Sequence, residues 1–155
     1  MKLEIRDAAP DDGAIIASYN TRLAEETEGR PLQPDIIGAG VAAILADRGK
    51  GRYWVAEHDG QVIGQIMVTY EWSDWRNGTL WWIQSVYVHT DFRRKGVYSS
   101  LFKHVESLAK SDDSVRGLRL YVESGNKRAQ QTYEALGMVD PQYRVMETIF
   151  EAPQC

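Results

Sequence analysis

The sequence predicts a mixed α/β (α+β) protein with a mostly antiparallel sheet and helices on both of its faces. Three strand-like segments follow one another and are joined by the turn dipeptides Asp59-Gly60 and Asn77-Gly78, which is typical of an antiparallel meander. A strand–helix–strand unit follows and adds a parallel strand. With 155 residues, 43 % apolar and 26 % charged, the chain has the size and composition of one globular domain. We therefore expect a single domain over residues 1–155, with the element order β-α-α-β-β-β-α-β-α-β.

The N-terminal third is predicted to hold one strand and two helices. Residues Met1–Asp7 alternate weakly between apolar and polar side chains, which indicates a strand. Pro10 followed by two aspartates favours a helix start, because proline suits the first helical position and carboxylates suit the positive end of the helix dipole. Gly29 is a suitable end for this helix, and Pro34 marks the start of the second.

The middle of the chain is predicted to form the meander. Its three strands are expected at Arg52–His58, Val62–Trp72 and Thr79–Val88. The third is a long apolar run, so we expect it to be buried on both faces, as a central strand is.

Two helices and two strands complete the predicted order. Apolar residues at helical spacing indicate a helix from about Lys95 to Lys110, and a short strand follows at Gly117–Val122. The next helix spans Asn126–Leu136 and is closed by Gly137. A last strand is predicted at Tyr143–Phe150.

Charge and composition exclude several classes of function. The net charge of -4 argues against nucleic-acid binding, which needs a cationic face. The single cysteine, Cys155, is a poor candidate for a nucleophile, and three scattered histidines without a CxxC pair predict no metal site. The N-terminus lacks the apolar segment of a signal peptide, and no run of apolar residues is long enough to span a bilayer. We therefore expect a cytoplasmic protein that binds neither membranes nor nucleic acids.

The segment Val86–Leu101 carries the clearest chemical signal. It reads as a buried strand, a polar turn with glycine, and a helix, so free N–H groups and the positive end of a helix dipole meet at one point. Arg93, Arg94 and Lys95 add positive charge there. They could simply be solvated surface residues. However, cations at a helix N-terminus are unfavourable unless an anion compensates them, which favours a bound phosphate.

Two motifs carry a family resemblance. Residues Arg93–Tyr98 resemble the (Gln/Arg)-x-x-Gly-x-(Gly/Ala) signature of the GCN5-related N-acetyltransferases (GNAT). Asn126–Met138 resembles the Asn-x-x-Ala-x-x-x-Tyr-x-x-x-Gly-Met/Phe segment of the same family. The element order matches as well, so the resemblance covers nearly the whole chain and implies the GNAT acyl-CoA N-acyltransferase fold. Tyr98 departs from the motif, so its side chain must point away from the phosphates or the loop must open.

The resemblance implies acetyl-CoA as cosubstrate and no metal. The sheet is then expected to splay between the strand ending at Val88 and the strand Gly117–Val122, with pantetheine along the first of these. Asn126 would contact the cosubstrate, or act only as a helix cap. The full set of residues expected to bind acetyl-CoA is Val86, Val88, Arg93, Arg94, Lys95, Gly96, Val97, Tyr98, Ser99 and Asn126.

Two catalytic residues are expected. Tyr133 corresponds to the tyrosine with which the family protonates the CoA thiolate, and a phenol within hydrogen-bond reach can do so. A core aromatic is the alternative reading. The attacking amine must also lose a proton. Relatives often use a glutamate on the long strand, but Gln84 and Ser85 stand there, so Glu71 is the first candidate for the base. A carboxylate of the cluster Glu25, Glu26 and Glu28 is the alternative.

The acceptor side is expected to hold Glu26, Trp72 and Gln84. Trp72 and Trp75, beside Glu71 and Asp74, could form an aromatic and acidic wall for a cationic amine, which loosely resembles polyamine acetyltransferases. Core packing is the alternative role for the tryptophans of this segment, and it explains at least Trp81 or Trp82, which alternate between the two sheet faces.

The expected function is transfer of acetyl from acetyl-CoA to a primary amine of a small molecule, with a polyamine-like amine as one candidate. Two alternatives stay open: an acceptor that is a protein or peptide amine, and a module that binds acyl-CoA without turnover. The resemblance also implies a homodimer.

Overall fold

The computed structural model describes residues 1–151, so the prediction for Cys155 lies outside the described residues. The chain forms two compact units, residues 1–121 and a second unit that begins at Val122. The prediction of a single domain stays a prediction. Among the described residues, no helix combines the length and apolar content that a membrane crossing requires.

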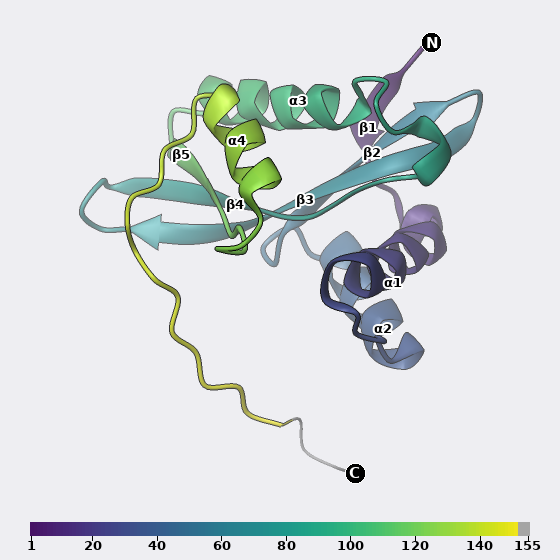
Figure 1. The fold of residues 1–155 in the computed structure, drawn as a ribbon, viewed down its shortest axis with the longest axis horizontal. Coiled ribbons are helices and arrows are strands. Elements are labelled where there is room, and N and C mark those ends of the chain that lie inside the picture. The colour runs from purple at the N-terminus through teal and green to yellow at the C-terminus, as the bar shows by residue number, and fades with distance from the viewer. Residues whose placement is uncertain (152–155) are drawn as a thin grey trace. The chain divides into compact units, whose positions relative to one another are not determined.

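The first unit is built on a five-stranded sheet with the order β1-β2-β3-β4-β5 (Figure 1). The first four strands pair antiparallel, and β5 pairs parallel to β4. The predicted mixed, mostly antiparallel sheet is therefore confirmed. The strands are β1 (Glu4–Asp7), β2 (Arg52–His58), β3 (Gln61–Ser73), β4 (Gly78–Val88) and β5 (Val115–Leu120).

Helices cover both faces of this sheet, as predicted. The helices α1 (Gly13–Glu28) and α2 (Pro34–Ala46) lie on one face, and α3 (Val97–Ser111) lies on the other (Figure 1). Short 3₁₀ turns precede α1 at Pro10–Asp12 and α3 at Thr90–Phe92. Pro10 thus begins a 3₁₀ turn rather than the α-helix itself.

Local turn chemistry is confirmed at two predicted positions, and it differs at a third. Gly29 ends α1 with a φ of 63°, a left-handed conformation that favours glycine. Asp59 and Gly60, with φ of 49° and 76°, form the tight turn between β2 and β3. The loop between β3 and β4 is longer than a two-residue turn, because Ser73 pairs with Gly78 and only Asn77 of the second dipeptide has positive φ.

Each helix layer has its own core on β2 and β3. Tyr53, Val55 and Met67 pack with Ile16 of α1 and Val41 of α2. Because adjacent strand residues point to opposite faces, Trp54 faces α3 instead, where its ring lies 6.3 Å from that of His104 and 5.9 Å from that of Trp81. Strand β2 is therefore buried on both faces, which holds the two helix layers to one sheet.

The second unit contains α4 (Lys127–Ala135). The Asn126 side chain caps it, accepting a hydrogen bond of 3.0 Å from the backbone N–H of Ala129. Gly137 follows with a φ of 94°, as the predicted helix end requires. The predicted helix Asn126–Leu136 is thus confirmed to within one residue at each end.

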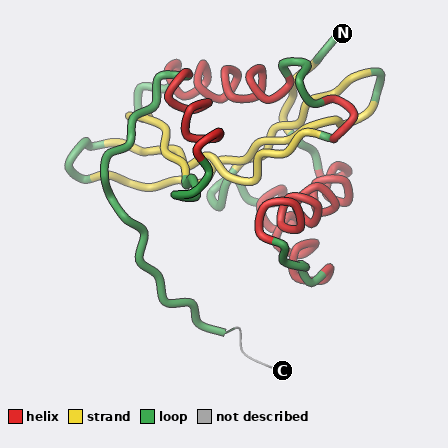
Figure 2. Tube along the Cα trace, viewed as in Figure 1, coloured by secondary structure: helices red, strands yellow, loops and turns green. Residues whose placement is uncertain are grey.

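The predicted last strand at Tyr143–Phe150 is wrong. Figure 2 shows this part of the chain as loop, and within the described residues it pairs with no strand. Its apolar side chains are 62 % to 93 % exposed at Tyr143, Val145, Met146, Ile149 and Phe150. The observed order is therefore β-α-α-β-β-β-α-β-α. Apolar alternation shows that a segment suits a sheet face, but a strand also needs a partner for its backbone groups, and alternation does not supply one.

A charged cluster ties β1 to the start of α1. Arg6 donates hydrogen bonds of 2.8 and 3.0 Å to the two carboxylate oxygens of Asp12, and a third of 3.0 Å to Glu57 on β2. Asp12 also accepts a bond of 2.7 Å from the Ala9 N–H. The bonds from Arg6 hold the pKa of Asp12 below its usual range.

We expect Asp12→Asn to destabilise the fold by about 2 kcal/mol at neutral pH, because an amide cannot accept all three bonds and leaves Arg6 poorly paired. Since the folded state lowers the pKa of Asp12, its stabilisation is present above the unfolded pKa and is lost as pH falls through the lower folded value. Urea unfolding at about pH 7 and about pH 3 checks this, and the difference between the variant and the wild type should shrink at the lower pH. An equal difference at both pH values would contradict it.

Candidate functional site

The central feature of the site is a β-bulge in β4. Gln65 of β3 pairs with Tyr87 and Met67 pairs with Gln84, so two residues of β4, Ser85 and Val86, lie opposite a single residue of β3. Ser85 has a φ of 53°, which is unusual for a residue with a side chain. The bulge therefore turns the backbone of β4 at this point.

The other edge of β4 loses its partner at nearly the same position. The parallel ladder between β4 and β5 ends where Ile83 pairs with Leu120, although β4 continues to Val88. Within this sheet, the backbone from Gln84 to Val88 thus has no strand on its β5 side. This is the expected splaying between the two strands, and it begins at the bulge.

A buried amide holds the bulge in place. Gln65 is 0 % exposed, and its Nε2 donates to the Ser85 carbonyl at 3.1 Å and to Asn20 Oδ1 at 3.2 Å. Asn20 of α1 in turn donates to the Tyr53 hydroxyl at 3.0 Å. Burial raises the pKa of Tyr53, so this network is neutral. Gln65 was not predicted as a site residue from the sequence. A single amide side chain within the apolar run of β3 is the pattern that could have indicated it.

A pocket of about 390 Å³ opens beside this network, between α1, α2 and the sheet. Three of its polar lining residues are the network members Asn20 and Tyr53 and the bulge residue Ser85. Most of the remaining lining is aliphatic and comes from α1, α2 and Met67 of β3.

The N-terminus of α3 follows β4 after the 3₁₀ turn Thr90–Phe92 and a short loop. Gly96 is its N-cap residue with a φ of 81°, and among the described residues no side chain caps the helix. Gly64 of β3 allows this helix start to approach the sheet, because a Cβ there would lie 3.2 Å from the Tyr87 carbonyl and from Val97. A helix N-terminus beside the exposed side chains of Arg94 and Lys95 could hold an anion.

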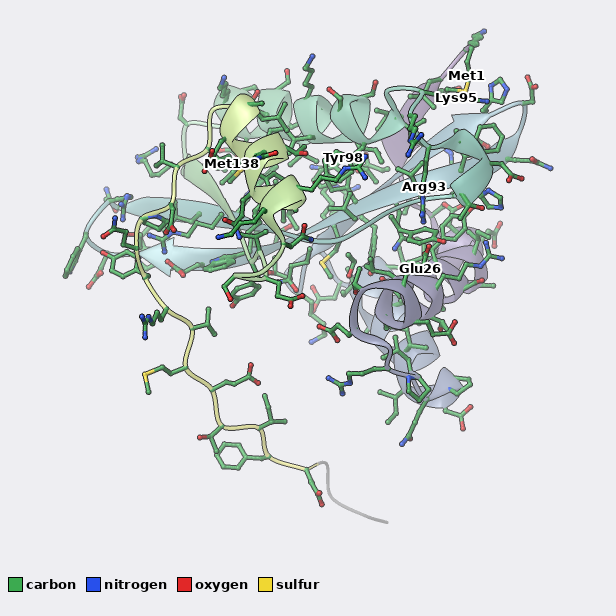
Figure 3. All side chains as sticks on the ribbon, in the orientation of Figure 1. Met1, Glu26, Arg93, Lys95, Tyr98 and Met138 are labelled. Atoms are coloured by element: carbon green, nitrogen blue, oxygen red, sulfur yellow. The ribbon has the colours of Figure 1, made fainter. Side chains whose placement is uncertain are left out.

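Arg93 has a different role from its two neighbours. Its Nη2 lies 3.0 Å from Glu26 Oε1, its Nε donates to the Val88 carbonyl at 2.9 Å, and its guanidinium lies 5.2 Å from the centre of the Tyr87 ring. Figure 3 shows Arg93 and Glu26 facing one another between the loop and α1. Arg93 therefore joins α1 to the loop after β4. Both Glu26, expected at the acceptor, and the Val88 carbonyl, expected at the cosubstrate, already have Arg93 as a partner.

Tyr98, the residue that departs from the family motif, lies in the first turn of α3 and is half-buried (Figure 3). Ser99 follows it and is also half-buried, whereas Val97 is buried under the helix start.

The candidate base, Glu71, is bound through both oxygens. Trp82 Nε1 donates to Oε1 at 3.1 Å, and Arg119 of β5 donates to Oε2 at 2.9 Å. Nearby, Gln84 donates to Thr69 Oγ1 at 2.6 Å. The structure thus brings Glu71 together with Trp82 and Arg119. Arg119 was not predicted as a site residue from the sequence.

The predicted aromatic and acidic wall is not formed as one surface. Trp72 is 63 % exposed and follows Glu71 in β3, so the two side chains point to opposite faces. Trp75 is 90 % exposed in the turn between β3 and β4. Trp81, by contrast, is a core residue, as the alternative reading held.

Tyr133 lies in the second unit, on the partly buried side of α4 with Ala129 and Leu136. Asn126 acts as the N-cap of this helix, and its contact with a cosubstrate stays a prediction. The described residues hold no group of three or more His, Cys, Asp or Glu side chains that could bind a metal.

Comparison with known proteins identifies relatives of this chain. The sequence model of the acetyltransferase (GNAT) family matches residues 9–138. The crystal structure of a "possible acetyltransferase" from Clostridium difficile 630 is 45 % identical, with a TM-score of 0.92 over 98 % of this chain and 100 % of that one.

One further relative and one structural neighbour are more distant. Thialysine N-epsilon-acetyltransferase of Bos taurus is 33 % identical over 79 residues, which are 51 % of this chain and 45 % of that protein. The chain thus matches less than half the length of this relative. A predicted acetyltransferase from Clostridium acetobutylicum, solved with acetyl-CoA, is 17 % identical, with a TM-score of 0.78 over 95 % of this chain and 96 % of that one. At this identity the likeness shows the fold alone.

We expect Gly64→Ala to destabilise the fold by about 1–3 kcal/mol, because the new methyl would press on the Tyr87 carbonyl and on Val97 and Leu101. It should also weaken anion binding at the α3 start. Gly38→Ala is the control, since a Cβ at Gly38 meets nothing within 4 Å and alanine favours the helix. Chemical denaturation and calorimetric titration with coenzyme A check both effects. A Gly64→Ala protein as stable as the wild type would show that this close approach is not tight.

Proposed function

The chain belongs to the acetyltransferase (GNAT) family, and from this premise we propose that it transfers acetyl from acetyl-CoA directly to a primary amine of a small molecule. The observation that carries the proposal is the conjunction at the end of β4: a backbone bulge, a strand edge without a strand partner in this sheet, and the N-terminus of the next helix, which no described side chain caps. This conjunction offers backbone groups to a thioester and its pantetheine arm, and N–H groups to phosphates.

Two findings support acetyl-CoA as the cosubstrate. GNAT acetyltransferases use acetyl-CoA, and one solved structural neighbour holds it. In our proposal Val86 and Val88 bond the pantetheine arm through their backbone. The first turn of α3 and the preceding loop bind the pyrophosphate through Arg94, Lys95, Gly96, Val97, Tyr98 and Ser99, with Arg93 holding the loop in place and Asn126 as a further contact. No metal takes part in this proposal.

The chemistry requires one proton to leave the amine and one to reach the sulfur. As the amine nitrogen attacks the acetyl carbonyl, the bond from that carbon to sulfur breaks and the thiolate leaves. We assign Tyr133 to give its proton to the thiolate, and Glu71, which lies along β3 from the pocket, to accept the proton of the amine through water molecules. Trp82 and Arg119 orient the Glu71 carboxylate. Gln84 and Glu26 remain the candidates for contact with the acceptor, whereas the Trp72 side chain points to the opposite face of β3 from Glu71.

An amine acceptor is supported by the bovine relative, whose name states acetylation of an amine nitrogen. The proposal further includes a homodimer and a cytoplasmic location. A second copy would give the exposed apolar side chains between Tyr143 and Phe150 a surface to pack against.

The proposed reaction is tested by measuring thiol release from acetyl-CoA with a panel of small primary amines. We expect release that depends on the amine and a product acetylated on nitrogen. Tight binding of acetyl-CoA with no release across the panel would contradict the proposal and favour a module that only binds acyl-CoA. Release with peptide amines alone would favour a protein acceptor.

For Tyr133→Phe we expect an unchanged Kd for acetyl-CoA and a kcat lowered by about 10²-fold, because only the proton donor is lost. Steady-state kinetics and calorimetric titration measure the two quantities separately. Tyr143→Phe is the matched control, since it also removes a single hydroxyl but lies in the exposed segment after α4. An unchanged kcat for Tyr133→Phe would remove this residue from the mechanism.

For Glu71→Gln we expect kcat/KM to fall by about 10²-fold near neutral pH. The loss should narrow at high pH, where the free amine is already neutral and needs no base. A pH profile of both proteins checks this, and Glu106→Gln on α3 serves as the control. A loss that is equal at every pH would assign Glu71 a structural role.

A further inference from the structure

We propose that the acceptor carries a single amine on an uncharged aliphatic body, and that this body binds in the pocket between α1, α2 and the sheet. The inference rests on the proposed function for its reaction, but the pocket itself can be tested without turnover. This inference limits the acceptor to aliphatic monoamines and replaces the expectation of a polyamine-like substrate.

The lining of the pocket matches an aliphatic ligand. Its volume of about 390 Å³ is well above the ~150 Å³ that holds a benzene-sized ligand, and within the range of small-molecule sites. Among the described residues that line it, Glu28 alone is charged. Its apolar side chains are those of Leu23, Ala24, Leu32, Ile37, Val41, Ile44 and Met67.

The polar part of the pocket lies where the reaction would occur. Ser85 stands at the β4 bulge, and Asn20 and Tyr53 are linked by a hydrogen bond of 3.0 Å. These groups are uncharged, and burial raises the pKa of Tyr53 above that of an ordinary tyrosine, so its hydroxyl stays protonated. An amine must itself be neutral to attack, so this neutral polar end suits its nitrogen while the aliphatic lining suits the remainder of the molecule.

The carboxylates that could recognise a second ammonium already have cationic partners. Glu26 binds Arg93 at 3.0 Å, and Glu71 binds Arg119 at 2.9 Å. Glu28, at the pocket, lies 3.9 Å from Arg30, and both side chains are largely exposed to solvent. A diamine would therefore place its second charge among aliphatic side chains, with only this solvent-exposed carboxylate near it, which is unfavourable.

The chain offers a matched pair of variants in α2. Gly40 lines the pocket and Gly38 does not, yet a Cβ at either position meets nothing within 4 Å. Leucine at either position should favour the helix equally. Gly40→Leu therefore fills part of the pocket, while Gly38→Leu changes the same helix outside it.

The experiment compares kcat/KM for n-alkylamines from propylamine to hexylamine, and for cadaverine, which has as many non-hydrogen atoms as hexylamine. We expect kcat/KM to rise about fourfold per methylene, the equivalent of ~0.8 kcal/mol per buried CH₂. Hexylamine should exceed cadaverine by about tenfold or more. Gly40→Leu should flatten the series, and Gly38→Leu should preserve it. A flat series in the wild type, a preference for cadaverine, or a Gly40→Leu series like that of the wild type would overturn the inference.

Direct binding separates this inference from the proposed function. Calorimetric titration of hexylamine in the presence of coenzyme A measures occupancy of the pocket without chemistry. Binding that Gly40→Leu abolishes, in a protein that turns over no amine, would support the pocket and contradict the proposed function. Absence of hexylamine binding would overturn the inference. So would a Gly40→Leu variant that loses affinity for hexanoyl-CoA but not for hexylamine, since the pocket would then hold the acyl chain of the donor.

Discussion

The hydrogen bond from Gln65 to the Ser85 carbonyl is the contact on which the candidate site depends. It fixes a residue with positive φ inside a strand, a conformation that persists only where its surroundings enforce it. The same amide reaches Asn20, so the position of α1 and the path of β4 are set by one buried side chain. Because Gln65 is fully buried, slippage of this register would leave its Nε2 group unpaired in the core.

A second set of contacts brings the helix start to the bulge. Gly64 stands next to Gln65 and lets α3 approach β3, while Arg93 ties the intervening loop to Glu26 on α1. The end of β4 is thus held from both faces of the sheet, by α3 above Gly64 and by α1 through Asn20 and Glu26. Rigid support on both sides is what a site that positions two reactants requires, because most of its rate advantage comes from their alignment.

Local signals explain which parts could be predicted from the sequence. The helix ends at Gly29 and Gly137 and the Asp59-Gly60 turn each depend on neighbouring residues, and these predictions agree with the structure. The bounds of β5 differ from those predicted by two residues at each end, because a parallel strand is delimited by its partner. The partner of Arg93 lies 67 positions away, and that of Gln65 lies 45 away, so no local pattern indicates either. The predicted strand at Tyr143–Phe150 is wrong for the same reason, because strand formation depends on pairing with a strand edge that is distant in the sequence.

The proposed site has a donor half, at β4 and the start of α3, and an acceptor half, at the pocket beside α1 and α2. In this proposal the donor half would use backbone groups, so tyrosine at position 98 could replace a smaller residue without removing the N–H groups themselves. The acceptor half would be built from side chains of α1 and α2, where each residue contributes shape or apolar area. Substitutions on this helix pair could then change the acceptor while the sheet and the donor half persist. Solved structures only 17 % and 20 % identical to this chain keep TM-scores of 0.78 and 0.81, so the fold itself persists while most side chains change. The motif therefore indicates the donor, whereas the acceptor has to be inferred from the pocket.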